Sequence, residues 1–135
     1  MTAMKFGFVI VEGCDEESLA AEQTLHHLTE VEGEIECHRV PGTAETVLAA
    51  KCFAELTSVD AVLVFLPASS AVEPSVLTAT LEGLTDIVLD WNMPIVTTIS
   101  YPDGASLAHA AVTMVEMQIE MEQKAEGKMV DTSVN

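Results

Sequence analysis

Positive charge is the scarcest property of this 135-residue chain. Its five Lys and Arg residues stand against 22 Asp and Glu residues, so the formal net charge is -17 at pH 7. A field of that sign repels nucleic-acid phosphates and anionic membrane surfaces. We therefore expect no nucleic-acid partner and no membrane partner. The composition is that of an acidic cytoplasmic protein, and it is also compatible with a halophilic source that keeps high intracellular salt.

Cysteines and long hydrophobic runs are scarce as well. Cys14, Cys37 and Cys52 are odd in number and lack Cys-x-x-Cys spacing, which favours reduced thiols in the cytoplasm over disulfides. No apolar run approaches the roughly 18 residues of a membrane span. The apolar segment 6–11 is shorter than a signal-peptide core and is followed by acidic residues. We interpret it as the first strand.

What the chain does have is a hydrophobic content of 49%, enough to bury the core of one domain. We assign residues 1–126 to that domain and residues 127–135 to a polar tail. Short apolar runs and one alternating run predict strands at 6–11, 34–40, 62–66 and 95–99. Helical patterns with start signals lie at 15–29, 43–57, 74–90 and 104–125.

Strict alternation of strand and helix predicts an α/β fold with a four-stranded parallel sheet covered on both faces. Acidic residues along 34–40 make that strand the exposed edge. Right-handed crossovers then favour the strand order 2-1-3-4. The expected architecture is a flavodoxin-like three-layer α/β/α sandwich.

Ligands of such sheets bind outside the carboxyl ends of the strands, near the point where the chain reverses direction. The candidate ligand-binding residues at that edge are Cys14, Thr43, Ala44, Glu45, Ala68, Ser69, Ser70 and Tyr101. Glu45 has two interpretations. An acid at a helix start stabilises the helix dipole by well under about 1 kcal/mol, or it faces a bound ligand.

Several motifs in order carry a family resemblance. They are Val-Pro-Gly-Thr-Ala-Glu at 40–45, Leu-Ala-Ala-Lys at 48–51, Asp-Ala-Val at 60–62, Gly-Leu at 83–84, Val-Leu at 88–89 and Met-Pro-Ile-Val at 93–96. This pattern resembles the lumazine synthase family over most of residues 5–120. The resemblance implies condensation of a ribitylamino-pyrimidinedione with a ketose phosphate, without metal or cofactor. It also implies pentamer-based homo-oligomers with sites between subunits, where Glu45 contacts the ribityl chain.

The chain departs from that family where the chemistry takes place. Glu-Gly-Cys-Asp at 12–15 replaces the stacking aromatic residue, and Thr97 replaces an aromatic residue that the family supplies from a neighbouring subunit. Segment 67–74 contains no His for proton transfer, and segment 101–107 contains no cation for the phosphate. Glu73 is either a remnant of the family's acidic position or an ordinary helix start.

We therefore interpret the chain as a divergent member with a degenerate catalytic site. It is expected to form a symmetric homo-oligomer, to be non-catalytic or altered, and to hold a flavin or a ribitylated pyrimidine at the subunit interface. One alternative is an active lumazine synthase of riboflavin biosynthesis with a rearranged site. A second alternative is a structural shell-forming protein without a ligand.

A few remaining residues have competing interpretations. Met114, Met117 and Met121 recur at helical spacing with Ile119 nearby, which predicts packing against the sheet or against another subunit. Tyr101 either caps a strand end or stacks on a heterocycle. Cys14 is a possible nucleophile, although neighbouring acids oppose formation of a thiolate.

Overall fold

The computed structural model describes residues 4–12, 15–30 and 33–131. In chain order the described elements are β1 (Lys5–Val11), α1 (Asp15–Glu30), β2 (Glu34–Val40), α2 (Thr46–Leu56), β3 (Ala61–Phe65), the 3-10 turn η1 (Ser69–Ala71), α3 (Pro74–Trp91), β4 (Ile95–Thr97) and α4 (Gly104–Asp131). Strand and helix alternate as the sequence predicts.

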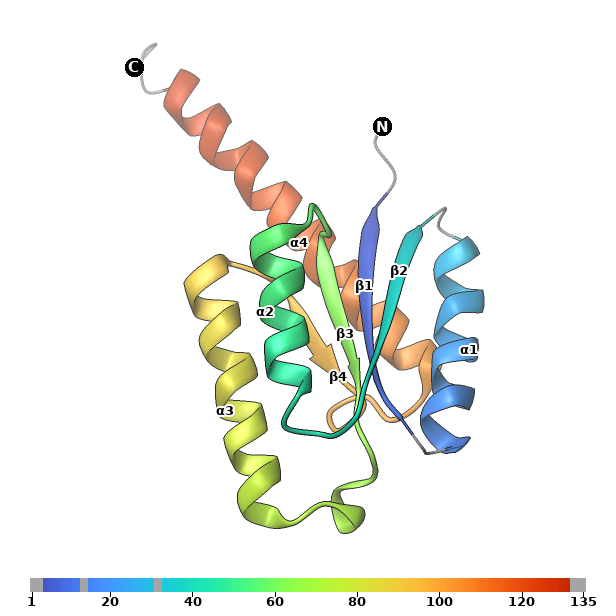
Figure 1. The fold of residues 1–135 in the computed structure, drawn as a ribbon. Coiled ribbons are helices and arrows are strands. Elements are labelled where there is room, and N and C mark those ends of the chain that lie inside the picture. Colours follow the sequence, from blue (N-terminus) through green and yellow to red (C-terminus); the bar gives the residue numbers. More distant parts are fainter. Residues whose placement is uncertain (1–3, 13–14, 31–32, 132–135) are drawn as a thin grey trace.

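The four strands form one parallel sheet in the order β2-β1-β3-β4 (Figure 1). Phe6 of β1 lies opposite Ile35 of β2 on one side and Ala61 of β3 on the other. Val62 of β3 lies opposite Ile95 of β4. The predicted order is confirmed, and β2 is an edge strand as expected.

Helices cover both faces of the sheet, with α2 and α3 on one side and α1 and α4 on the other (Figure 1). Alternate residues of a strand point to opposite faces. Phe6 and Phe8 of β1 therefore join the core beneath α1 and α4, while Val9 and Val11 join the core beneath α2 and α3. The central strand β3 is buried along its whole length. This arrangement confirms the predicted α/β/α sandwich.

Several element boundaries differ from the sequence prediction, and two of these differences have a local cause. The second helix begins at Thr46 instead of residue 43, because residues 43–45 form a turn in which the Thr46 hydroxyl donates to the Thr43 carbonyl (2.6 Å). β4 ends at Thr97 instead of residue 99. The backbone N–H groups of Ser100 and Tyr101 both donate to the Thr97 carbonyl, so the chain turns away from the sheet there.

The last helix is longer than predicted and carries an exposed apolar face. α4 continues through Gly127 to Asp131, so the segment expected to be a polar tail is helical as far as Asp131. The prediction that Met114, Met117, Met121 and Ile119 pack against the sheet is wrong, because all four side chains are exposed. Leu107, Ala111 and Val115 fill that position instead. Among the described helices, none combines the length and the apolar character needed to cross a membrane.

At Gly104 the backbone of α4 lies directly against α1. A Cβ atom built on Gly104 would lie 2.6 Å from the Gln23 Cβ and 2.8 Å from both the Ala20 carbonyl oxygen and the Thr24 backbone nitrogen. The Thr24 hydroxyl bonds the Ala20 carbonyl at 2.7 Å and lies 3.3 Å from the Gly104 carbonyl. Backbone atoms cannot move aside as a side chain can, so only glycine fits at this crossing.

Replacing Gly104 with alanine tests this packing. We expect Gly104→Ala to lower the free energy of unfolding by about 1–3 kcal/mol through overpacking. Gly127→Ala is a matched control in the same helix, because nothing lies within 4 Å of a Cβ at that position. Gly127→Ala is expected to raise the free energy of unfolding by about 0.5–1 kcal/mol, because alanine favours the helix more than glycine does. Urea denaturation of both variants measures the difference, and equal stabilisation by the two substitutions would contradict the packing account.

Candidate functional site

A small cavity of about 280 Å³ lies at the carboxyl ends of β3 and β4. Its lining residues are Ala20, Leu66, Pro67, Ala68, Ser69, Thr98, Ile99 and Pro102. The Thr98 hydroxyl accepts from the Leu66 N–H (2.8 Å) and lies 3.0 Å from the Leu66 carbonyl, to which it donates. In η1, the Ala71 N–H donates to the Ala68 carbonyl at 2.8 Å. Because these backbone donors already have partners, they are poorly placed to bind a phosphate.

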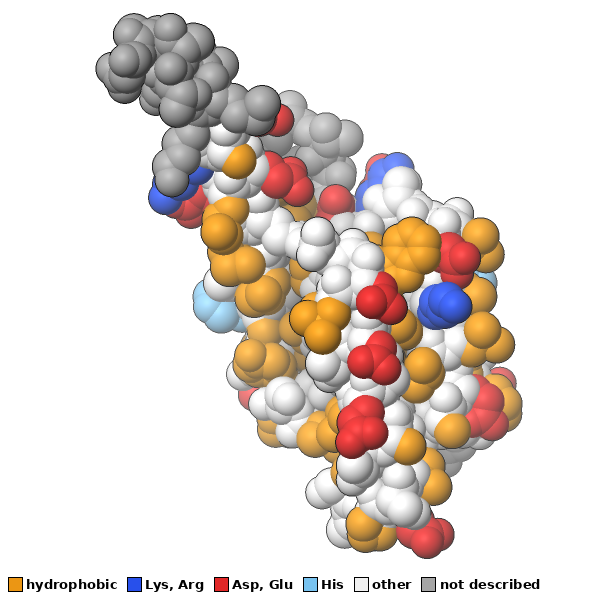
Figure 2. All heavy atoms as spheres, turned by 90° about the vertical axis from the view of Figure 1, so that its left-hand side faces the viewer, with side chains coloured by type: hydrophobic (Ala, Val, Ile, Leu, Met, Phe, Trp, Pro, Cys, Tyr) orange, Lys and Arg blue, Asp and Glu red, His pale blue; other side chains and the backbone are white. Residues whose placement is uncertain are grey.

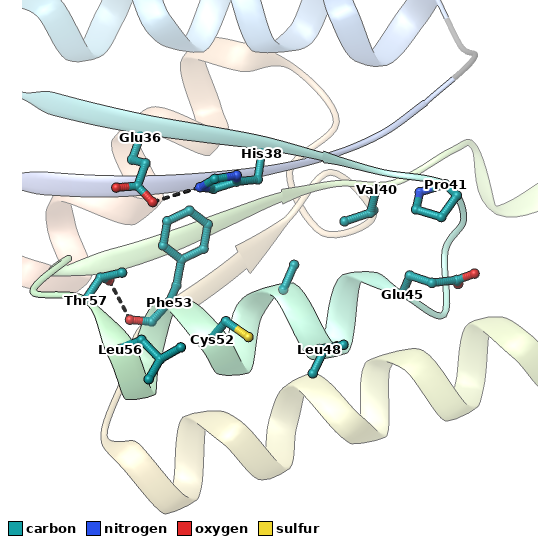
Figure 3. A pocket seen from close by; sticks show the side chains of 11 residues that line it. Glu36, His38, Val40, Pro41, Glu45, Leu48, Cys52, Phe53, Leu56 and Thr57 are labelled. Atoms are coloured by element: carbon teal, nitrogen blue, oxygen red, sulfur yellow. Dashed lines mark hydrogen bonds and ion pairs between the residues drawn. The ribbon is translucent and has the colours of Figure 1, made fainter.

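A larger groove of about 530 Å³ runs between the edge strand β2 and the helix α2 (Figure 3). We call it the β2–α2 groove. Its lining residues are Glu36, His38, Val40, Pro41, Glu45, Leu48, Ala49, Cys52, Phe53, Leu56 and Thr57. Figure 3 shows Pro41 and Glu45 at one end and Leu56 and Thr57 at the other. The groove therefore follows α2 from its first turn to its last.

The position of Phe53 explains why the groove exists. The Phe53 ring packs on β1 at Gly7, where an added Cβ would lie 2.7 Å from the ring. This contact holds α2 over the centre of the sheet. Since β2 lies beyond β1 at the edge, its α2-facing side chains at 36 and 38 are exposed, whereas Val40 at the end of the strand is buried. Leu48 and Leu56 border the same space and are 68% and 76% exposed.

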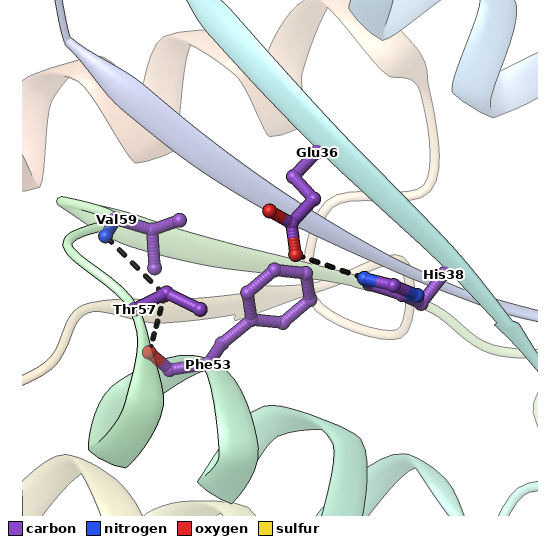
Figure 4. Close-up of polar contacts among 5 residues, drawn as sticks. All are labelled: Glu36, His38, Phe53, Thr57 and Val59. Atoms are coloured by element: carbon purple, nitrogen blue, oxygen red, sulfur yellow. Dashed lines mark hydrogen bonds and ion pairs between the residues drawn. The ribbon is translucent and has the colours of Figure 1, made fainter.

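A polar pair lies beside the aromatic wall of the groove (Figure 4). The His38 Nε2 atom lies 2.8 Å from the Glu36 Oε2 atom. The His38 ring also lies against the Phe53 ring, with 5.5 Å between centroids and a tilt of 57°. Nearby, the Thr57 hydroxyl donates to the Phe53 carbonyl at 2.6 Å and closes the end of α2. Glu36 thereby holds the His38 ring, and Thr57 holds the last turn of α2 through the Phe53 backbone carbonyl.

Glu45 is the N-cap residue of α2, but its side chain makes no capping hydrogen bond. Its carboxylate instead lies over Gly42, where a Cβ would be 3.2 Å from the Oε2 atom. The side chain is exposed at the mouth of the groove (Figure 3). Its position at the helix start still favours a negative charge. The carboxylate oxygens nevertheless face solvent, where they can accept hydrogen bonds from a ligand.

The groove is apolar with a negative rim. Glu36 and Glu45 line it, and neither Lys nor Arg is among its lining residues. Cys52 is a free, exposed cysteine in the groove. Cys37 projects to the opposite side of β2, and desolvation of its thiol raises the pKa of Cys37 despite the opposing charge of Arg39. Within the described ranges, no group of three His, Cys, Asp or Glu side chains is arranged to hold a metal ion.

The candidate residues from the sequence do not meet in one cavity. Glu45 lines the β2–α2 groove, and Ala68 and Ser69 line the small cavity after β3. Ala44 lines a hollow between α2 and α3, and Tyr101 lines a hollow beside α4. Thr43 contributes its carbonyl to the turn before α2, and Ser70 lies exposed in η1. Cys14 lies outside the described residues.

The strand order explains this separation. Glu45 follows β2 and Tyr101 follows β4, and these are the two outer strands of the sheet. Three strand spacings of about 4.8 Å each separate such strands by roughly 14 Å. Glu45 and Tyr101 also line separate hollows. Glu45 and Tyr101 therefore belong to different surfaces of the subunit.

Sequence reasoning missed the residues that form most of the groove. The sequence predicts Glu36 and His38 on the edge strand and Phe53 in a helix, and it does not place any of them among the candidate ligand-binding residues. The signals that identify them are the alternation along β2 and the spacing of Leu48, Cys52 and Leu56 by four residues on α2. Both patterns leave side chains facing the same uncovered strip of the sheet.

The segment after β4 contains a helix cap instead of a ligand site. The Asp103 carboxylate accepts hydrogen bonds from the Ser106 N–H and the Ser106 hydroxyl, both at 2.8 Å. These hydrogen bonds lower the pKa of Asp103 below its ordinary value. Asp103 thus caps the start of α4, and its oxygens are occupied by the cap.

The cap makes the stability of the fold depend on pH in a defined direction. The folded state lowers the pKa of Asp103, so the ionised carboxylate stabilises the folded state. This contribution is complete above the unfolded pKa of about 3.9 and is lost as the pH falls through the lower folded pKa. We expect Asp103→Ala to unfold at a lower urea concentration than the parent at pH 7. The difference between the two urea midpoints should become smaller below pH 4. Asp103→Asn, which keeps a neutral acceptor, is the control for the charge. A gap that stays constant from pH 7 to pH 3 would contradict the capping role.

Comparisons with known proteins identify the fold only. No protein-family model matches the chain, and no curated protein matches it. Among solved structures, a de novo designed Rossmann-fold protein is similar, with 18% sequence identity and a TM-score of 0.50. The alignment covers 84% of this chain and 97% of the designed chain. The chain thus has a Rossmann-like α/β fold with the strand order β2-β1-β3-β4.

Proposed function

We propose that this chain is a divergent relative of lumazine synthase that assembles into homo-oligomers and holds a ligand without transforming it. The ligand class is an uncharged ring system with a polyol chain, such as riboflavin or a ribitylated pyrimidine. The observation that carries the proposal is the β2–α2 groove, which combines an aromatic and aliphatic wall with one free carboxylate at its mouth.

The wall of the groove supports binding of a flat ring. His38 presents exposed aromatic surface that is backed by the buried Phe53 ring, and Leu48 and Leu56 present exposed aliphatic surface on the facing helix. A volume of about 530 Å³ lies within the range of small-molecule sites. An inserted ring would remove much of this apolar surface from water, which is the main favourable contribution to binding.

Glu45 supports the polyol part of the ligand. A carboxylate accepts charge-assisted hydrogen bonds from hydroxyl groups and needs no cation to do so. A phosphate is a poor occupant of the same groove, because Glu36 and Glu45 repel it and no lining Lys or Arg offsets its desolvation. The groove therefore favours the dephosphorylated, hydroxyl-bearing member of this ligand class.

The openness of the groove supports an assembled protein. Leu48 and Leu56 are exposed although both are large aliphatic residues. A neighbouring copy lying across this surface would cover them and close the pocket, so that the ligand would lie between subunits. An open groove on a monomer would bind the same ring more weakly, because one of its faces would stay in water.

The alternative functions require different residues and different binding properties. An active lumazine synthase needs a proton-transfer group after β3 and a cation after β4, and segments 67–74 and 101–107 contain neither a His nor a Lys or Arg. A structural shell protein needs assembly but no pocket ligand. Ligand binding and turnover together therefore distinguish the three functions.

Riboflavin binding tests the ligand part of the proposal. We expect purified protein to quench riboflavin fluorescence saturably, and Glu45→Ala to weaken the binding by roughly tenfold to a hundredfold through loss of charge-assisted hydrogen bonds. Glu55→Ala is the matched control, since Glu55 is an exposed acid of α2 outside the groove lining. Absence of binding by the parent protein, or equal weakening by both variants, would rule out this site.

Turnover tests whether catalysis is lost. We expect no lumazine formation above the uncatalysed rate when the protein is incubated with both family substrates. A general acid or base contributes about 10²–10⁴-fold to such steps, and the loop after β3 has no His to provide it. A rate comparable with that of ordinary lumazine synthases would make the active-enzyme alternative correct.

A further inference from the structure

The helix α4 carries a second apolar face that the proposed ligand site does not use. Its first half lies on the sheet, and its second half extends beyond the body of the domain (Figure 1). Hydrophobic side chains follow this helix along one side of the molecule (Figure 2). Ala110, Met114, Met117 and Met121 are separated by four, three and four residues. We call these four residues the α4 seam.

The spacing of the α4 seam is that of a helix-pairing surface. Apolar residues at alternating intervals of three and four form the contact line between two paired helices. The three methionines are exposed, whereas Leu107 and Ala111 on the neighbouring face of α4 are fully buried against the sheet. Methionine side chains are flexible and fill irregular gaps, which suits a contact between two helices.

A hollow lies at one end of the seam. Its lining residues are Tyr101, Ala105, Ser106, His109, Ala110, Thr113 and Met114. The small side chain of Ala110 is one of these lining residues and is 8% exposed. The opposite end of the seam bears the large side chain of Met121, which is 62% exposed. One end of the seam thus offers a space, and the other offers a side chain that can fill it.

We propose that two copies of this chain pair through their α4 seams in antiparallel orientation, with Met121 of each copy seated over Ala110 of the other. In this register Met117 lies opposite Met114, so each large residue meets a space or a flexible partner. A two-fold contact of this kind is self-complementary. The inference rests on the assembly part of the proposed function and is independent of the ligand.

Charge also favours the antiparallel orientation. The projecting half of α4 carries Glu116, Glu120, Glu122 and Glu126, and a parallel pair would place these acids side by side. An antiparallel pair in this register separates Glu120, Glu122 and Glu126 from the same residues of the other copy and aligns the two helix dipoles favourably. It also brings Lys124, which pairs with Glu120 of its own helix at 3.0 Å, toward the partner's first turn of α4, where Asp103 provides a negative charge. Charge and shape therefore select the same arrangement.

Self-association of seam variants tests the pairing. We expect light scattering to show smaller particles for Met117→Glu than for the parent. The protein concentration at which half of the chains are associated should rise by at least about tenfold. Ile119→Glu is the matched control, because Ile119 lies on another face of α4 and is 43% exposed, compared with 41% for Met117. Circular dichroism checks that both variants stay folded.

Each outcome of this comparison has a definite meaning. A smaller Met117→Glu particle beside an unchanged Ile119→Glu particle supports the α4 seam. Unchanged assembly of Met117→Glu, or equal disruption by both variants, overturns the seam but leaves assembly itself standing. A parent protein that is monomeric at all concentrations overturns both the seam and the assembly part of the proposed function.

Cysteine crosslinking tests the orientation in a background where the native cysteines are replaced by serine. We expect Met121→Cys chains mixed with Ala110→Cys chains to form a disulfide-linked heterodimer under mild oxidation. Met121→Cys chains alone should crosslink poorly, because 11 residues of helix hold the two Met121 positions about 16 Å apart in the antiparallel register. Efficient crosslinking of Met121→Cys alone, without the mixed product, would overturn the antiparallel arrangement.

Discussion

The contact between the Phe53 ring and the backbone of Gly7 determines where α2 lies, and the groove depends on that position. A side chain at residue 7 would occupy the space of the ring, because its Cβ would lie 2.7 Å from it. With the ring held there, α2 covers β1 and the central strand and leaves the inner face of β2 only partly covered. His38 then packs against Phe53, and Glu36 holds the other side of the imidazole. The groove is thus a consequence of one aromatic residue placed over one glycine.

Scarcity of positive charge determines what that groove can accept. The chain has 22 Asp and Glu residues and a net charge of -17, and both carboxylate or cationic residues that line the groove, Glu36 and Glu45, are acids. Hydrogen-bond acceptors are therefore abundant at the groove, whereas positive charges that would offset the desolvation of a bound anion are scarce. Hydroxyl-bearing and uncharged compounds fit this balance better than phosphates do. The same scarcity, together with the occupied backbone donors after β3, separates this chain from the chemistry of the family that its motifs resemble.

The fold was largely predictable from the sequence, whereas the site was not. The buried run of β3 and the alternation along 34–40 indicate strands through local patterns, and strand 34–40 matches β2 at both ends. The faces of α4 were not predictable, because its sequence has two apolar stripes, one with Ala111 and Val115 and one with Met114 and Met117. Small residues allow the first stripe to approach the sheet closely, and that choice depends on packing across the whole domain. Likewise, Glu45 and Tyr101 share a predicted sheet edge, but the width of the sheet separates them.

The two exposed apolar surfaces lie at opposite edges of the sheet, and this arrangement limits how copies can combine. The β2–α2 groove borders the edge strand β2, whereas α4 packs on β3 and β4 and is tied to the end of α3 by the Gln118 amide, which donates to the Asn92 carbonyl at 2.6 Å. A copy bound at one surface therefore leaves the other surface open. The proposed contact at the α4 seam would relate two copies by a two-fold axis, whereas a contact across the groove that joined different surfaces of two copies would form rings if its rotation closed. The two proposed contacts together would produce assemblies larger than a dimer, in which the ligand pocket and the helix pair would form independently of each other.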